Sequence, residues 1–188
     1  VVLELLARFD EEANINWAQR LEEVGAHVVY GVVGHKTHAK MLMVVRREAD
    51  PANAAAGRLR RYVHLATGNY HSRTAKLYTD FGLFTGNEDI GNDVADIFMQ
   101  LTGLGRATKL RHLRQSPFTL HKEMIRSIEN EMAIAKAGRK GQIIAKMNAL
   151  VEPPVIEALY RAAEAGVEID LIIRGICCLR PGVPGLSE

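Results

Sequence analysis

The chain has 188 residues, enough for one domain or two small ones. It is 47% hydrophobic and 24% charged, the composition of an ordinary globular protein. The net charge of +2 is too small to favour a nucleic-acid binder, which needs a concentrated basic face, but it permits an anionic small ligand.

The cysteines and the absence of targeting patterns bear on the compartment. Cys177 and Cys178 are adjacent, so they form no disulfide framework and indicate a reducing compartment only weakly. We find no signal-peptide pattern and no apolar run near the roughly 20 residues that span a bilayer. We therefore expect a cytoplasmic protein, with peripheral attachment at the inner face of the cell membrane left open. The apolar start and the Pro/Gly-rich end predict a fragment of a longer protein.

The first part of the chain alternates strand-like apolar runs with amphipathic helices. Helices are predicted between Glu12 and Gly25, where apolar residues follow a helical period, and from Gly91 to Gly103. The polar, Ala-rich residues 46–57 predict a loop. Strands are predicted over residues 1–6, 27–33, 41–45, 59–65 and 77–83.

The second part of the chain repeats this alternation after a basic connection over residues 103–117. Helices are predicted over 118–137 and from Pro153 to Gly166, and strands over 142–147 and 167–173. The pattern predicts an α/β fold with two lobes. The first would span residues 1–105, and the second, over residues 115–188, would be truncated.

A helix–glycine–strand pattern occurs twice at a constant offset. Gly25, a strand and Gly34 are matched by Gly166, a strand and Gly175. Such units are common in α/β proteins, so chance remains one explanation. The other is a duplicated half, whose own functional histidine would then lie beyond Glu188.

The candidate chemistry begins at His38 and Lys40, which precede an apolar strand. Side chains two apart on a strand point to the same side, so the imidazole and the ammonium would face one site. A histidine is mostly neutral and nucleophilic at pH 7, and a lysine can balance the charge of a transferring phosphoryl group. The alternative for His38 is an ordinary surface or packing residue.

The turn Thr67-Gly68-Asn69 ends the next predicted strand. Its glycine lets the backbone approach an anion, and the Asn69 amide can donate to a phosphoryl oxygen. An ordinary strand-ending turn remains the alternative. The nearby Asp80-Phe81-Gly82 spells the magnesium motif of protein kinases, but the other kinase motifs are missing, so we interpret it as chance.

A His-x-Lys strand followed by a Gly-Asn turn resembles the half-site of the phospholipase D superfamily, whose histidine is the nucleophile at phosphorus. That pattern normally has an aspartate a few residues after the lysine. Here residues 41–45 contain no acid. This departure argues against an ordinary phosphodiesterase.

The longer resemblance is to the polyphosphate kinase family, and it covers essentially the whole chain. It implies two phospholipase D-like lobes and reversible transfer of the ATP γ-phosphate to polyphosphate through a phosphohistidine, with Mg²⁺ as cofactor. The matching segments, in order, are residues 7–15, 36–40, 67–70, 74–80 and 174–177.

The resemblance implies roles for six residues. An arginine cannot ligate a cation, so the one at the magnesium-site position would act through phosphate oxygens. For Arg8, the alternative is a residue in a surface ion pair. For Tyr78, the alternative is a half-buried aromatic residue of a strand. The six are the phosphohistidine His38, catalytic Lys40 and Asn69, nucleotide-contacting Tyr78 and Arg174, and Arg8 at the magnesium-site position.

The expected partners are ATP or ADP and inorganic polyphosphate, with no nucleic acid, and the resemblance suggests a homo-oligomer. A fragment that lacks half the site is expected to be inactive alone. Two rival interpretations stay open. One is a phospholipase D-like phosphodiesterase, and the other is a non-catalytic lobe that binds polyanions.

Overall fold

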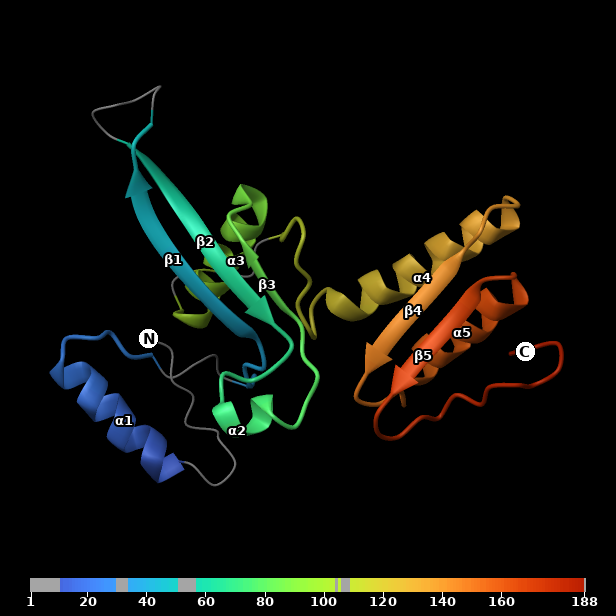
Figure 1. Cartoon of the computed structure of the whole chain (residues 1–188), viewed down its shortest axis with the longest axis horizontal. Coiled ribbons are helices and arrows are strands. Elements are labelled where there is room, and N and C mark those ends of the chain that lie inside the picture. Colours follow the sequence, from blue (N-terminus) through green and yellow to red (C-terminus); the bar gives the residue numbers. More distant parts are fainter. Residues whose placement is uncertain (1–10, 30–33, 51–56, 104, 106–108, 188) are drawn as a thin grey trace. The chain divides into compact units, whose positions relative to one another are not determined.

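The computed structural model describes residues 11–29, 34–50, 57–103, 105 and 109–187. It divides into two compact units, Val1–Leu113 (unit 1) and Arg114–Glu188 (unit 2), shown in Figure 1. The predicted strand over residues 1–6 and most of that over 27–33 lie outside the described residues. The mixed α/β class predicted from the sequence is confirmed.

Unit 1 contains an antiparallel sheet with the strand order β1-β2-β3. Lys40 lies opposite Ala66, and Ala66 lies opposite Gly82, so these three residues share one row at one end of the sheet. The His-x-Lys segment and the Thr67-Gly68-Asn69 turn therefore meet at that end. The elements of unit 1 are α1 (Glu11–Glu23), β1 (Lys40–Glu48), β2 (Arg58–Ala66), α2 (Ser72–Ala75), β3 (Gly82–Thr85) and α3 (Glu88–Leu101).

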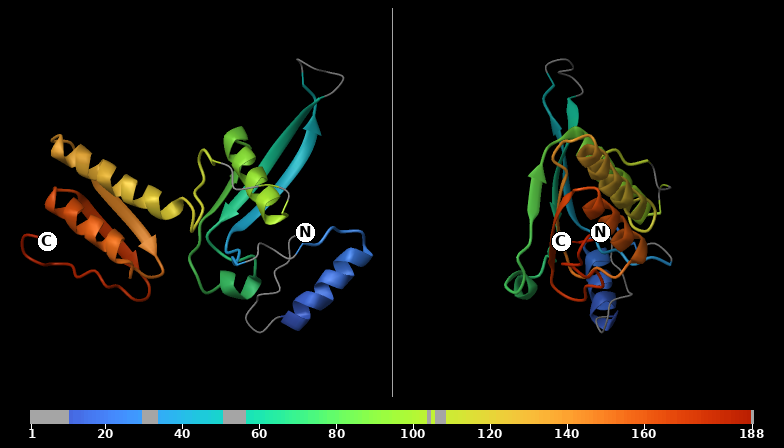
Figure 2. Two further views of the ribbon diagram at one scale, coloured as in Figure 1. Left: turned by 180° about the vertical axis from the view of Figure 1, so that it is seen from behind. Right: turned by 90° about the vertical axis from the view of Figure 1, so that its right-hand side faces the viewer.

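Helix α3 covers one face of this sheet (Figure 2). Val63 of β2 and Val94 of α3 are buried there, with 2% and 0% of their surface exposed. Residues next to each other on a strand face opposite sides, so His64 and its cross-strand neighbours Leu42 and Phe84 lie on the other face. That face carries the row that begins at Lys40.

Several predicted elements of unit 1 differ from the observed ones. Strand β1 continues to Glu48, so residues 46–48 of the predicted loop are strand, paired with residues 58–60 of β2. Residues 77–81 lie outside any strand, and β3 begins only at Gly82. The Phe81 N–H donates to the Thr67 side-chain oxygen in place of a backbone carbonyl of β2, while the Phe81 carbonyl accepts the Thr67 N–H. Helix α3 begins at Glu88, before Gly91, because the Asn87 side chain accepts the N–H of Ile90 at 3.0 Å and caps it.

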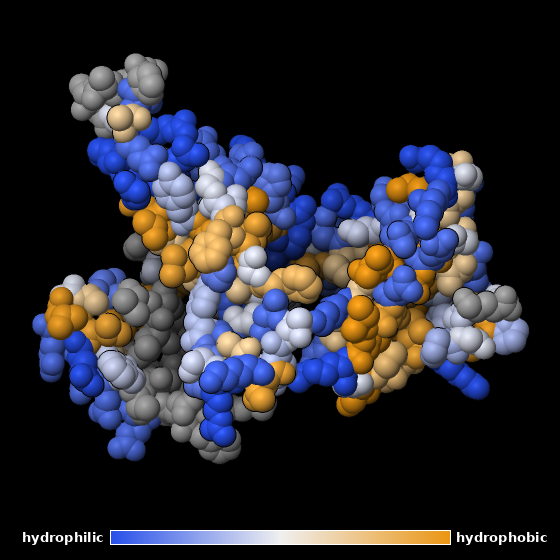
Figure 3. Space-filling view, in the orientation of Figure 1, coloured by the Kyte–Doolittle hydropathy of each residue, from blue (hydrophilic) through white to orange (hydrophobic). Residues whose placement is uncertain are grey.

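Unit 2 pairs two parallel strands, β4 and β5, with both helices on one face (Figures 1 and 2). Alternate strand residues such as Ile143 and Ile169 pack against the helices around Ile128 and Leu159. Ile144 and Ile172 point the other way and are exposed, and Figure 3 shows apolar surface over these strands. The elements are α4 (Leu120–Lys136), β4 (Gln142–Met147), α5 (Pro153–Glu164) and β5 (Glu168–Ile173).

The two glycines of the internal repeat adopt the same conformation. Gly25 and Gly166 have φ angles of 82° and 87°, and each closes its helix with the same pair of backbone hydrogen bonds. Gly138 ends α4 with an equivalent pair. The shared cap is therefore general in this chain, and duplication of a half remains a prediction. None of the described helices is long and apolar enough to cross a membrane.

A buried carboxylate fastens the end of unit 1 to α3. Asp93 is 3% exposed and accepts the backbone N–H groups of Arg111, His112 and Leu113 at 2.9, 2.7 and 2.9 Å. Burial alone would raise the pKa of Asp93, but these three donors together hold that pKa below its ordinary value.

We expect Asp93→Asn to destabilise the protein by about 1–3 kcal/mol at pH 7, because its NH₂ group would face backbone donors. A carboxyl group whose pKa is lower in the folded than in the unfolded protein stabilises the fold at pH values above its unfolded pKa. This stabilisation is lost as the pH falls through the folded pKa. The deficit of the variant should therefore shrink towards pH 3. Urea unfolding at both pH values measures it, with exposed Glu129→Gln as the control. Equal stability at pH 7 would contradict the assigned role.

Candidate functional site

His38 and Lys40 lie in direct contact at the start of β1. The Lys40 Nζ is 3.0 Å from His38 Nε2 and donates to the His38 carbonyl oxygen at 2.7 Å. An ammonium group has no acceptor, so in this contact Nε2 accepts and the ring proton lies on Nδ1. The His38 side of the contact is exposed to solvent. The structure thus brings together the two residues that the sequence placed two apart.

The charge of Lys40 is influenced from a second segment. Partial burial lowers the pKa of Lys40 from its ordinary value, and the negative charge of Asp80 acts in the opposite direction. Asp80 lies between the turn that follows α2 and the start of β3. From the sequence alone, the Asp80-Phe81-Gly82 match is interpreted as chance, and Asp80 has no predicted role.

An open hollow of about 510 Å³ lies at the same end of the sheet. Its size is within the range of small-molecule sites. It brings together the predicted residues Asn69 and Tyr78 with Asp80. The residues that line it are His64, Ala66, Gly68, Asn69, Tyr70, Ala75, Tyr78, Thr79, Asp80, Phe81 and Gly82.

The wall of the hollow is a tightly fastened turn. The Thr67 hydroxyl donates to Asp80 at 3.1 Å and accepts the N–H of Phe81 at 2.9 Å. A Cβ atom on Gly68 would lie 2.2 Å from the Asp80 Oδ2, so only glycine lets this carboxylate approach the turn so closely. The sequence predicts that Gly68 lets the backbone approach an anion. In the structure, the anionic group next to Gly68 is the Asp80 carboxylate.

His64 is a residue of this hollow that the sequence analysis did not single out. Its Nδ1 is 2.8 Å from the Tyr70 hydroxyl, and its ring stacks on Phe84 with centroids 4.2 Å apart. The available signal was its position two residues before Ala66, which puts it on the face that carries Lys40.

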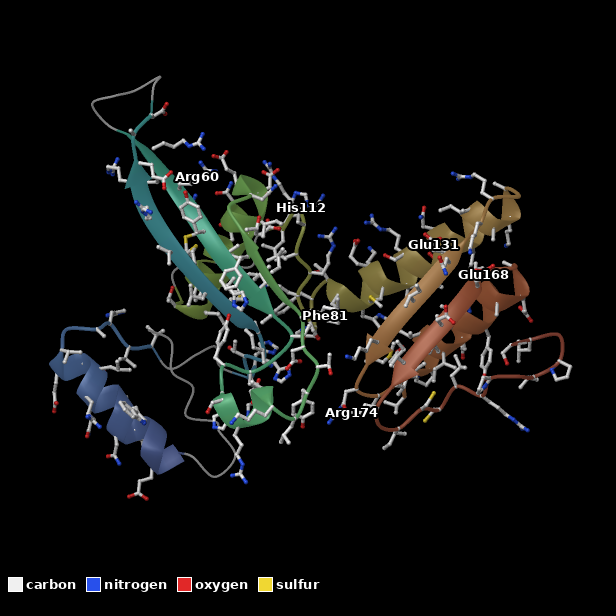
Figure 4. The ribbon with its side chains drawn as sticks, in the orientation of Figure 1. Arg60, Phe81, His112, Glu131, Glu168 and Arg174 are labelled. Atoms are coloured by element: carbon white, nitrogen blue, oxygen red, sulfur yellow. The ribbon has the colours of Figure 1, made fainter. Side chains whose placement is uncertain are left out.

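Arg174 lies in unit 2, directly after β5 and beside the end of β4 (Figure 4). Its Nε donates to the Asn148 side-chain oxygen at 3.1 Å, and its Nη2 donates to the same oxygen. Asn148 follows β4 directly, and its carbonyl also accepts the N–H of Gly175 at 2.7 Å. Both side chains therefore lie at the carboxyl edge of the parallel strands, where α/β sheets commonly bind ligands. Asn148 is the second residue that sequence reasoning missed.

The arginines of β2 each have a partner inside unit 1. Arg58 lies 2.8 Å from Glu88, Arg60 lies 4.0 Å from Glu48, and Arg61 donates to Asn92 at 3.0 Å. These contacts account for the arginine-rich strand without a bound polyanion.

Arg8, the position that the family resemblance gives as a magnesium site, lies outside the described residues. Among the described residues, no group of three or more His, Cys, Asp or Glu side chains could hold a metal ion. Magnesium is commonly bound through one or two carboxylates and substrate phosphates, so a set of protein ligands alone is not its usual site.

The sequence matches two families along its length. Residues 1–107 match Polyphosphate kinase C-terminal domain 1, and residues 113–188 match Polyphosphate kinase C-terminal domain 2.

Curated relatives and a solved structure agree with these matches. The chain is 63% identical over 188 residues to a polyphosphate kinase of Burkholderia ambifaria and 64% identical to that of Burkholderia cenocepacia. It covers 27% of the length of each. The crystal structure of polyphosphate kinase from Porphyromonas gingivalis superposes with a TM-score of 0.84 at 39% identity, over 99% of this chain and 30% of that one. The family expected from the sequence and its fold are confirmed, and this chain belongs to the polyphosphate kinase family.

Proposed function

We propose that this chain is a catalytic segment of an ATP:polyphosphate phosphotransferase. The observation that carries the proposal is the contact of Lys40 Nζ with His38 Nε2, 3.0 Å apart, at the end of the sheet that holds the hollow. The family membership supports it, and the whole protein's reaction is inferred from there because the chain spans only 27% of its curated relatives. Residues 1–105 and 115–188 would form the two lobes.

In the proposed reaction, His38 Nε2 attacks the γ-phosphorus of ATP. The new N–P bond forms as the bond from the γ-phosphorus to the β,γ-bridging oxygen breaks, and ADP leaves. A terminal phosphate oxygen of polyphosphate then attacks the phosphohistidine and regenerates the imidazole. The reverse sequence converts ADP and polyphosphate to ATP.

The roles of the neighbouring groups follow from charge. Lys40, which contacts Nε2 before transfer, would turn to the oxygens of the phosphoryl group once the nitrogen is occupied. The Asn69 amide would donate to the same group from the turn. Mg²⁺ would enter with the nucleotide phosphates and balance their charge, and Arg8 would contact those phosphates.

Nucleotide contacts are proposed for Tyr78, in the wall of the hollow, and for Arg174 in unit 2. An aromatic ring can stack on a base, and a guanidinium binds phosphate through two parallel hydrogen bonds. Assembly as a homo-oligomer, a cytoplasmic location and the absence of nucleic-acid partners belong to the same proposal. The 188-residue chain alone is expected to be inactive.

The test uses the full-length protein with ATP labelled at the γ-phosphate. We expect a labelled protein and labelled polyphosphate, and no cleavage of bis(p-nitrophenyl) phosphate in the absence of nucleotide. Cleavage of that phosphodiester without labelling would favour the phosphodiesterase alternative. Binding of polyphosphate without either reaction would favour a binding lobe.

We expect Asn148→Ala to raise the KM for ATP about 5- to 30-fold with a smaller change in kcat, because Arg174 loses the acceptor that orients its guanidinium. Steady-state kinetics of the full-length protein measure this. Gln142→Ala, an exposed position at the other end of β4, is the control and should leave KM unchanged. An unchanged KM in Asn148→Ala would remove Asn148 from the nucleotide site.

A further inference from the structure

His64 is a residue of the hollow to which the proposed reaction gives no role. Of the described side chains that line the hollow, it is the only one that can carry a positive charge near pH 7. The Asp80 carboxylate lines the same hollow and would repel a phosphate group. A phosphate that binds there therefore needs a donor such as the His64 ring, and the position of that ring decides whether it can serve.

Three neighbours fix the imidazole ring of His64. Its Nδ1 lies 2.8 Å from the Tyr70 hydroxyl, and its ring stacks on Phe84 with an angle of 28° between the planes. Its Nε2 lies over Gly82, where a Cβ atom would come within 2.8 Å of the nitrogen, so the ring fits only because this residue has no side chain. No hydrogen bond joins Nε2 to another described residue. Nε2 is therefore the nitrogen that can meet a ligand.

The sheet register places this nitrogen relative to the proposed phosphoryl acceptor. Lys40, Ala66 and Gly82 lie side by side across β1, β2 and β3, on the face that also carries His64. Neighbouring strands are about 4.8 Å apart, so Lys40 and Gly82 are about 10 Å apart, with the Ala66 methyl group between them. Lys40 beside His38 stands at one end of this row, and the His64 Nε2 stands over the other. A substrate with several phosphates in a line can contact both.

The Tyr70 hydroxyl bears on which ring nitrogen carries the proton. When the hydroxyl donates to Nδ1, the proton of the neutral ring lies on Nε2. When the ring is protonated, Nδ1 donates to the hydroxyl oxygen and Nε2 donates into the hollow. Only a neutral ring that donates from Nδ1 would present a lone pair at Nε2. A phosphate oxygen accepts hydrogen bonds, so it selects the states in which Nε2 is a donor.

We propose that Tyr70 is a positioning residue, which holds the His64 ring with its Nε2–H directed at a phosphate oxygen of the substrate. The inference rests on the proposed phosphotransferase function. The phosphate contacted is one further along the chain from the group transferred to His38, in the nucleotide or in polyphosphate. Both substrates offer the same chemistry, an anionic oxygen bonded to phosphorus. Tyr70 itself touches no substrate and acts through His64.

The main test compares two variants of the full-length protein that each lose one tyrosine hydroxyl. Tyr70→Phe removes the hydroxyl that contacts His64 and keeps the aromatic ring. We expect it to slow phosphoenzyme formation at saturating ATP about 5- to 20-fold. Tyr62→Phe is the matched control, because its hydroxyl donates to Glu48 at 2.8 Å and does not line the hollow. It should stay within about twofold of the wild type. A wild-type rate in Tyr70→Phe would overturn the inference.

A double-mutant cycle tests whether Tyr70 acts through His64. His64→Gln places an amide near the position of Nε2, and His64→Asn places one near Nδ1. The variant with glutamine should retain more activity, because the donor that faces phosphate is Nε2, whereas a purely structural bond to Tyr70 would favour asparagine. Adding Tyr70→Phe to His64→Gln should slow the reaction less than about twofold further. A full further loss, or a more active His64→Asn, would contradict the inference.

Gly82→Ala reaches the same ring by another route. The added Cβ would lie 2.8, 3.7 and 3.8 Å from three atoms of the His64 ring and meets no backbone atom as closely, so it displaces the ring rather than the strand. The rate of phosphoenzyme formation should fall about 5- to 20-fold, as in Tyr70→Phe, while circular dichroism stays that of the wild type. A folded Gly82→Ala protein with the wild-type rate would contradict the proposed ring position.

Calorimetric binding separates this inference from the proposed function, because it requires no reaction. Tripolyphosphate and ATP are each titrated into the full-length wild type and His64→Asn, and both should bind about 3- to 10-fold more weakly to the variant. A loss for tripolyphosphate alone would assign the contact to the polyphosphate chain. A loss for ATP alone would place His64 at the nucleoside, and unchanged binding of both ligands would remove it from the site, so either result would overturn the inference. A wild type that binds both ligands but is never labelled would refute the proposed function alone.

Discussion

Replacing His38 by glutamine should abolish phosphoenzyme formation and lower polyphosphate synthesis by at least about 10³-fold in the full-length protein. Glutamine is similar in size to histidine and can still accept a hydrogen bond from Lys40, which contacts the ring at 3.0 Å in the wild type. It is not a nucleophile at phosphorus, however, so the covalent step is lost while the surroundings are retained. Labelling with γ-phosphate-labelled ATP and an assay of polyphosphate chain growth measure the two effects.

A matched control is available three residues earlier. His35 is exposed and precedes β1, and His35→Gln should retain both labelling and synthesis within about twofold. If His38→Gln instead retained a labelled histidine, the phosphoryl group would reside on another residue. The assignment of His38 as the nucleophile would then be wrong.

The second large effect is expected at Gly68. A Cβ atom there would lie 2.2, 2.5 and 2.9 Å from three side-chain atoms of Asp80, well inside any tolerated contact. Gly68→Ala must therefore push Asp80 away or distort the turn that carries Asn69. A displacement of about 1 Å in a catalytic constellation can cost about 10²-fold in rate, and we expect a loss of that order in phosphoenzyme formation. Strain of this kind also destabilises folding by about 1–3 kcal/mol.

Gly86→Ala is the control for this substitution. A Cβ at Gly86 would meet the Tyr62 ring at 3.4 Å, an ordinary contact, so the added methyl fits. It should leave the rate within about twofold of the wild type and the stability within about 0.5 kcal/mol. Rate measurements with urea unfolding distinguish the two variants. Wild-type rates in Gly68→Ala would show that the approach of Asp80 to the turn is not part of the site.

The sequence predicted regular elements well where apolar periodicity was uninterrupted. Strand β4 was predicted over residues 142–147 and is observed as Gln142–Met147, because its alternating residues face the helices on one side only. The start of α3 was missed because Gly91 was interpreted as preceding the helix. The capping signal of Asn87, followed by Glu88 and Asp89, was present in the sequence and locates the start.

The strand predicted over residues 77–83 shows where local pattern is insufficient. The segment contains the apolar and aromatic residues typical of a strand, yet Leu77 and Phe81 are exposed. The segment is instead held by Thr67, whose side chain bonds Asp80 and Phe81 across 13 and 14 residues of the chain. Such long-range hydrogen bonds are decided by tertiary structure, so a pattern confined to this segment cannot reveal them.

In the candidate site too, contacts set by local spacing could be predicted from the sequence, and contacts between distant segments could not. The pairing of His38 with Lys40 could be predicted, because it depends on the spacing within one strand. Asp80 and Asn148 could not, because their partners Gly68 and Arg174 are 12 and 26 residues away and meet them only in the folded chain. The roles of Arg8, Tyr78 and Arg174 came from the family resemblance and stay predictions.

The most direct measurement is mass spectrometry of the full-length protein after brief incubation with ATP, with peptides kept at alkaline pH because phosphohistidine is acid-labile. The account predicts a phosphate on the peptide that contains His38. This phosphate should be lost after acid treatment, and it should be absent once added polyphosphate has accepted the phosphoryl group from the protein. A phosphate on a different residue, or ATP-dependent polyphosphate synthesis with the His38 peptide never modified, would contradict it.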